Sequence, residues 1–132
     1  MSERCTFRRA CDLGHARACG ELGTVYSKRG DFVRARALQE KACAEGAMLA
    51  CMNLGSKLQH GIGGARDPKR AQELYEMSCD AGVQPGCFSL AQQLASGDGV
   101  PKDTARARDI YTKLCQAEDT FACDNLGELG SP

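Results

Sequence analysis

The chain has 132 residues, the length of one domain, and its 17 Lys and Arg residues balance its 17 Asp and Glu residues. This neutral balance argues against a nucleic-acid partner, and the absence of an apolar run of roughly 18 residues argues against insertion into a membrane. With no Trp, four Phe and three Tyr, an apolar core alone would be marginally stable.

Eight of the nine cysteines form four pairs, and seven residues separate the two members of each pair. The pairs are Cys11 with Cys19, Cys43 with Cys51, Cys79 with Cys87, and Cys115 with Cys123. From Cys43 the pairs recur every 36 residues, whereas the first two pairs are 32 residues apart. A fixed period of this size indicates a repeat array. We interpret residues 1–132 as one repeat domain, with partial units at 1–14 and 119–132 and complete units at 15–46, 47–82 and 83–118.

Each complete unit is predicted to contain two helices. Twelve residues before Cys43, Cys79 and Cys115 the chain carries an Asp, at positions 31, 67 and 103. An Asp at a helix N-cap accepts a hydrogen bond from a free backbone N–H and carries the charge that suits the positive end of a helix. In the first complete unit the turn before this helix, within SKRGDFVRA, is shorter than in the later units.

The second complete unit shows both ends of such a helix. Pro68 follows the capping Asp at the first helical position, where a missing N–H has no cost. Ala71, Leu74 and Tyr75 then follow with helical spacing. Gly82 is expected to end the helix with a positive φ.

The next helix is predicted to begin near Gln84 and to carry its apolar residues on one face. These residues are Cys87, Leu90, Ala91 and Leu94. The stretch GDGVPKD then turns the chain into the next unit. Applied along the chain, this pattern predicts about eight helices in an elongated array without strands.

The spacing of each cysteine pair places its first member in the last turn of one helix and its second member in the first turns of the next. A short turn makes these two helices antiparallel, so a direct disulfide is geometrically plausible. We expect four disulfides, with reduced core thiols or a metal site as the alternatives. Cys5 has no partner at this spacing, so we expect an exposed free thiol or an intermolecular disulfide.

Two long stretches carry a family resemblance. CMNLGSKLQHGIGGARDPKRAQELYEMSCDAG (51–82) and CFSLAQQLASGDGVPKDTARARDIYTKLC (87–115) resemble the Sel-one-like repeat, a relative of the tetratricopeptide repeat. The cysteine pairs resemble the Helicobacter cysteine-rich protein branch of that family. The resemblance implies an all-α fold, a right-handed α/α solenoid of disulfide-clipped helical hairpins. It also implies protein–protein interaction, and some members of this branch are associated with penicillin binding and β-lactamase activity.

The chain shows no catalytic constellation. No Ser is followed three residues later by a Lys, and the triplets S-D-N and K-T-G are absent. GIGG and GDGV lack the spacing of a nucleotide-binding loop, so we expect no cofactor, and we expect no metal. We therefore favour a non-catalytic scaffold. A weak β-lactamase or penicillin-binding protein, from the resemblance alone, and a redox-linked assembly factor are the alternatives.

The resemblance also suggests where a partner would bind. In a tetratricopeptide-like array the first helices of the units line a concave face, and residues from two positions after the helix cysteine onward point into it. The candidate partner-binding residues at these positions are Glu21, Thr24, Lys28, Asn53, Ser56, His60, Ser89, Gln92, Asn125 and Glu128. Met52, Phe88 and Asp124, each one position after the cysteine, lie beside them and are also candidates. Asn side chains can both donate to and accept from an extended peptide backbone.

Phe88 beside Met52 in register suggests an apolar pocket for a partner side chain. Packing between repeats is the alternative for Phe88, and simple solvation is the alternative for the polar positions. The partner is expected to be a protein or peptide. The chain is expected to be a monomer, with a Cys5-linked dimer as the alternative.

Disulfides on this scale point to an oxidising compartment: periplasmic, secreted or an organellar intermembrane space. The N-terminal stretch MSERCTFRRACDLG has no apolar region of a secretory signal. We therefore expect the sequence to be a trimmed or internal fragment.

Overall fold

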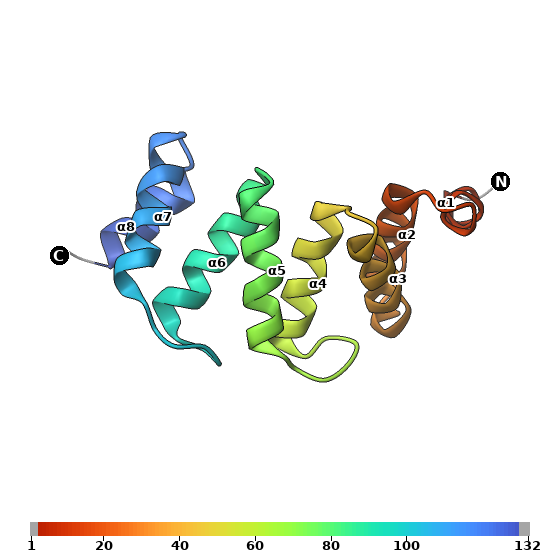
Figure 1. Cartoon of the computed structure of the whole chain (residues 1–132), viewed down its shortest axis with the longest axis horizontal. Coiled ribbons are helices and arrows are strands. Elements are labelled where there is room, and N and C mark those ends of the chain that lie inside the picture. The colour runs from red at the N-terminus through yellow and green to blue at the C-terminus, as the bar shows by residue number, and fades with distance from the viewer. Residues whose placement is uncertain (1–2, 130–132) are drawn as a thin grey trace.

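The computed structural model describes residues 3–129, with side chains from residue 6 onward. This part of the chain forms eight helices and no strand. The helices are α1 (Glu3–Asp12), α2 (Ala16–Lys28), α3 (Phe32–Ala44), α4 (Met48–His60), α5 (Pro68–Asp80), α6 (Gln84–Ser96), α7 (Thr104–Gln116) and α8 (Thr120–Glu128). They stand side by side in one row, with α1 and α8 at its two ends (Figure 1). The predicted all-α solenoid is confirmed.

The three helices predicted to begin at an Asp N-cap do have that cap. The carboxylates of Asp31, Asp67 and Asp103 accept hydrogen bonds from the backbone N–H groups three residues later, at 3.3, 3.2 and 3.1 Å. All three predicted N-caps are therefore confirmed. Asp119 caps α8 in the same way, accepting from the backbone N–H of Ala122 at 3.1 Å.

The turn between the two helices joined by each disulfide repeats one backbone conformation. Gly14, Gly46 and Gly82 have φ values of 92°, 97° and 90°. A residue without a Cβ adopts this left-handed conformation at no steric cost. At the fourth turn Glu118 takes the equivalent place with φ of 68°. The left-handed conformation is therefore kept although the residue is not glycine.

Small residues bring the first and second helices of a unit close together. Ala35, Ala71 and Ala107, each eight residues before a cysteine, are fully buried on the second helices. On the facing first helix, a Cβ added at Gly55 would lie 2.9 Å from the ring of Tyr75. The absence of a side chain at position 55 thus makes room for the Tyr75 ring and lets α4 and α5 pack closely.

The four predicted disulfides are present. Their Cα–Cα distances are 4.5 to 4.7 Å, within the usual range for such bridges. They join α1 to α2, α3 to α4, α5 to α6 and α7 to α8, so each ties the second helix of one unit to the first helix of the next. The side chain of Cys5 lies outside the described residues.

Ion pairs link successive second helices with the period of the repeat. Arg70 on α5 contacts Glu40 on α3 at 2.5 Å, and Arg106 on α7 contacts Glu76 on α5 at 2.6 Å. The partners in the second pair lie 36 residues after those in the first. Both pairs are half-exposed, so each contributes at most about 1 kcal/mol. None of helices α1 to α8 combines the length and apolar character required to span a bilayer.

Candidate binding groove

The first helices of the units, α2, α4, α6 and α8, share one face of the array, here called the first-helix face. Four hollows lie along it, and each is named by the helices that line it. The α2 hollow measures about 340 Å³, the α2–α4 hollow about 130 Å³, and the α4–α6 and α6–α8 hollows about 520 Å³ each. The two large hollows share Ser89, Gln92 and Asn125, so they adjoin one another.

Most of the candidate residues from the sequence line these hollows. They are Glu21, Thr24, Lys28, Asn53, Ser56, His60, Phe88, Ser89, Gln92 and Asn125. Met52 instead packs against the hydrophobic core. Asp124 and Glu128 are exposed on α8 and are outside the linings of these four hollows.

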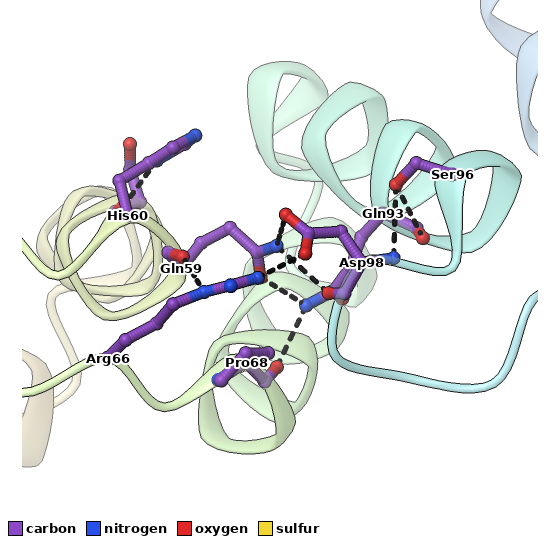
Figure 2. A network of polar contacts seen from close by, with 8 residues as sticks. Gln59, His60, Arg66, Pro68, Gln93, Ser96 and Asp98 are labelled. Atoms are coloured by element: carbon purple, nitrogen blue, oxygen red, sulfur yellow. Dashed lines mark hydrogen bonds and ion pairs between the residues drawn. The ribbon is translucent and has the colours of Figure 1, made fainter.

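The wall of the α4–α6 hollow contains a buried polar network that the sequence did not predict (Figure 2). The side-chain amide of Gln93 donates to the amide oxygen of Gln59 at 2.6 Å and to the backbone carbonyl of Pro68 at 2.8 Å. Gln59 in turn donates to the backbone and side-chain oxygens of Asp98, at 3.1 and 3.2 Å. Both glutamines are buried. The network joins α4 and α6 to the first residue of α5 and to the loop that follows α6.

Arg66 extends this network from the loop before α5. Its Nε donates to the backbone carbonyl of Gln59 at 2.7 Å, and its guanidinium forms an ion pair with Asp98. Hydrogen bonding to Arg66 lowers the pKa of Asp98 below its ordinary value. Because Arg66 neutralises Asp98, this acidic side chain adds little net charge to the hollow that it lines.

A histidine and two tyrosines also line the α4–α6 hollow. Nδ1 of His60 lies 2.9 Å from the backbone carbonyl oxygen of Ser56. The rings of Tyr75 and Tyr111 form part of the lining, and burial raises the pKa of each to about 12. A hydrogen bond to Ser56 opposes this shift at Tyr75. Both phenols are therefore neutral at physiological pH.

The α6–α8 hollow is the more apolar of the two large hollows. Phe88 is half-buried rather than exposed, because its ring packs edge-on against Tyr111 with centroids 5.7 Å apart. Phe88 also packs against the hydrophobic core while it lines the hollow, and its partner Tyr111 belongs to the same repeat unit. Pro85 and Phe121 complete the apolar lining, and Phe121 is 73% exposed.

Phe121 is a groove residue that the sequence analysis missed. It lies two residues before the second cysteine of its pair, and the equivalent positions hold Arg17, Leu49 and Pro85. Leu49 is also exposed, at 59%, and lines the α2–α4 hollow. The recurring apolar side chain at this position was the signal that could have found it. Among the side chains of residues 6–129, no three of His, Cys, Asp or Glu gather as a metal site.

A comparison with protein families matches the Sel1 repeat to residues 10–46, 49–83 and 85–119. The chain belongs to the Sel1 repeat family. Sel1 repeats are in general non-enzymatic scaffolds for protein–protein interaction. No curated protein sequence matches the chain.

Solved Sel1 structures share the fold. A Sel1 repeat protein from Oxalobacter formigenes superposes with a TM-score of 0.86 at 26% identity, covering 95% of this chain and 53% of its own length. The protective antigen c5321 of uropathogenic Escherichia coli superposes with a TM-score of 0.70 at 25% identity, over 96% of this chain and 36% of its own. The chain thus spans about half, or less, of these two relatives.

Cysteine-rich protein B of Helicobacter pylori is similar along nearly its whole length. It superposes with a TM-score of 0.70 at 26% identity, covering 92% of this chain and 90% of its own. This similarity and the disulfides agree with the cysteine-rich branch that the C-x7-C pairs resemble. Four intrachain disulfides in 132 residues are consistent with an oxidising environment.

Proposed function

We propose that this Sel1 repeat protein is a non-catalytic scaffold that binds a partner protein, through an extended segment, on the concave first-helix face. One observation carries the proposal: the hollows form a series along α2, α4, α6 and α8. Three of the hollows, of about 340 to 520 Å³, have the size of typical binding clefts. The protein would do this work in an oxidising compartment, periplasmic, secreted or organellar.

The side chains along this face suit an extended backbone. Ser56, Ser89, Gln92 and Asn125 are uncharged and can donate or accept hydrogen bonds. The exposed ring of Phe121 and the half-buried ring of Phe88 offer apolar area for a partner side chain. Polar groups for the main chain and apolar area for side chains occur together in the α6–α8 hollow.

The test compares matched surface substitutions in affinity enrichment from the native source. Gln92→Arg and Ser56→Arg place bulky charged side chains in the large hollows, while Glu73→Arg and Asp109→Arg do so at exposed positions of the second helices α5 and α7. A partner retained by the wild-type chain and by the second-helix variants, but lost by the first-helix variants, supports the proposal. A partner whose binding ignores both first-helix substitutions contradicts it.

A further inference from the structure

The ionised side chains of the first-helix face are separated by sign. At one end, Lys28 and Arg29 line the α2 hollow. Glu21 lines it too, but its carboxylate is paired with Arg17 at 3.1 Å. At the other end, Asp119 lines the α6–α8 hollow, and Glu128 lies close enough to Tyr111 to add to the rise in its pKa. The face is therefore positive at α2 and negative at α8.

Between these ends the face carries little net charge. Helix α6, QPGCFSLAQQLAS, contains no ionisable side chain except its disulfide-bonded cysteine. Asp98, which lines the α4–α6 hollow, is neutralised by Arg66. Helix α4 adds Lys57, which is 9% exposed, and His60, so the middle of the face is mainly polar and the two charged ends remain distinct.

Of the four charged side chains at the two ends, Asp119 also accepts the cap hydrogen bond of α8. The ion pairs among the described residues involve none of Lys28, Arg29, Asp119 and Glu128. On the second helices, in contrast, Arg70 and Arg106 are each paired with an acidic side chain of the preceding unit. Unpaired charges of opposite sign at the ends of one face are the arrangement that sets the register and orientation of a charged partner.

We propose that the groove is polarised and binds an extended protein segment with acidic residues at its α2 end and basic residues at its α6–α8 end. This inference rests on the proposed function and specifies the chemistry of the partner. At the α6–α8 end, the aliphatic stem of a Lys or Arg would lie on Phe88 and Phe121 while its cationic head reaches Asp119. At the α2 end, a carboxylate would meet Lys28 and Arg29 beside the apolar side chains of Phe7 and Val25.

The length of the segment follows from the spacing of packed helices. Three steps lead from α2 to α8 along the first-helix face, each of roughly 9 Å for neighbouring helices, so the charged ends are roughly 27 Å apart. An extended chain covers about 3.4 Å per residue, so about eight residues span this distance. A peptide of about ten residues therefore reaches both ends.

The test uses three capped ten-residue peptides of identical composition: two Glu, two Arg and six residues of alternating Ser and Leu. Two peptides carry both Glu at one end and both Arg at the other, in the two possible orders, and the third alternates Glu and Arg along its length. At low salt, calorimetry is expected to show that one of the polarised peptides binds at least tenfold more tightly than the alternating peptide. This advantage should fall severalfold at 500 mM salt because the interactions are screened.

Charge-removing variants then locate the interaction. Lys28→Gln with Arg29→Gln, and Asp119→Asn with Glu128→Gln, should each weaken binding of the polarised peptide at least fivefold. Asn retains the helix cap at position 119. The matched control, Glu40→Gln with Arg70→Gln, removes one charge of each sign from the second helices and should leave the affinity unchanged.

Equal affinity for the three peptides, or no binding of any, overturns the polarised groove. Loss of affinity in the second-helix control as large as in the end variants also overturns it. If the three peptides bind equally and shift the NMR signals of Ser56 and Gln92, the proposed binding face still stands. If the polarised peptide binds but shifts only signals of the second helices, the binding face itself is wrong.

Discussion

The amide of Gln93 donates a hydrogen bond to the amide oxygen of Gln59 across the first helices of two successive repeats, at 2.6 Å. These side chains are 3% and 7% exposed, respectively. The bond ties α4 to α6, and further hydrogen bonds connect the pair to the start of α5 at Pro68 and to Asp98 in the loop after α6. Both side chains line the α4–α6 hollow, so its shape depends on this pair.

Replacing Gln93 is therefore expected to destabilise the fold. Gln93→Ala leaves the acceptor oxygens of Gln59 and Pro68 without their donor and opens a cavity, at a cost of about 2 kcal/mol. Gln92→Ala, at the exposed neighbouring position, should change stability by at most about 0.5 kcal/mol. Urea unfolding followed by circular dichroism measures both, and equal stability of the two variants would contradict the role of the network.

The aspartate caps should matter for stability. Asp67→Ala and Asp103→Ala each remove the acceptor for a backbone N–H and should cost about 1 kcal/mol. Asp67→Asn keeps a capping side chain and should cost much less. Thermal melts of the three variants provide the comparison, and unchanged melting temperatures in both Ala variants would contradict the assigned helix starts.

Glu118 should be a site where glycine stabilises. Its φ of 68° is costly for a residue with a Cβ, and the other three turns carry Gly here. Because Gly also adds entropy to the unfolded chain, the net gain of Glu118→Gly is expected to be about 0.5 to 1 kcal/mol. Glu118→Ala should bring no such gain, and Gly82→Ala should lose about 1 kcal/mol. A destabilised Glu118→Gly variant in denaturant unfolding would refute this account of the turn.

The two buried tyrosines predict sensitivity to alkali. Each has a pKa raised from 10.0 to about 12 in the folded chain, chiefly by burial. The neutral phenol is thus favoured by folding, so its contribution to stability is complete below pH 10 and is lost as the pH rises through 12. The Tyr75→Phe, Tyr111→Phe double variant should lose less stability between pH 9 and pH 12 than the wild type. Urea unfolding measures this loss. If the free energy of unfolding falls equally for the two proteins between pH 9 and pH 12, these phenols do not cause the loss of stability.

Thiol counting tests the covalent framework. Nine cysteines less the eight in four disulfides leave Cys5, so the denatured, unreduced chain should contain one reactive thiol. Nine thiols before reduction would exclude the disulfides in the purified protein. Replacing one pair, Cys79→Ala with Cys87→Ala, should cost about 2.5 kcal/mol on the chain-entropy model, because the bridge closes a short loop.

Several features of the protein could be predicted from the sequence because they depend on residues close together along the chain. A helix cap requires an Asp three residues before the N–H that it accepts, as at Asp103 and Arg106. The left-handed turn at Gly82 and the disulfide across it depend only on residues within a short stretch of sequence. With a regular period, these local rules were sufficient to determine the order of helices and the cysteine pairing.

The tertiary structure alone decided how the first-helix face is shaped. Gln59 and Gln93 are 34 residues apart, and no local rule indicates that their amides meet. Phe88 was interpreted either as part of an apolar pocket or as packing between repeats, and its ring lies against Tyr111 because α6 and α7 pack closely. Lys28 and Arg29 lie at one end of this face and Asp119 at the other. They share one surface only because the helices stack. Contacts between distant residues depend on the approach of whole helices, which neighbouring residues along the chain do not specify.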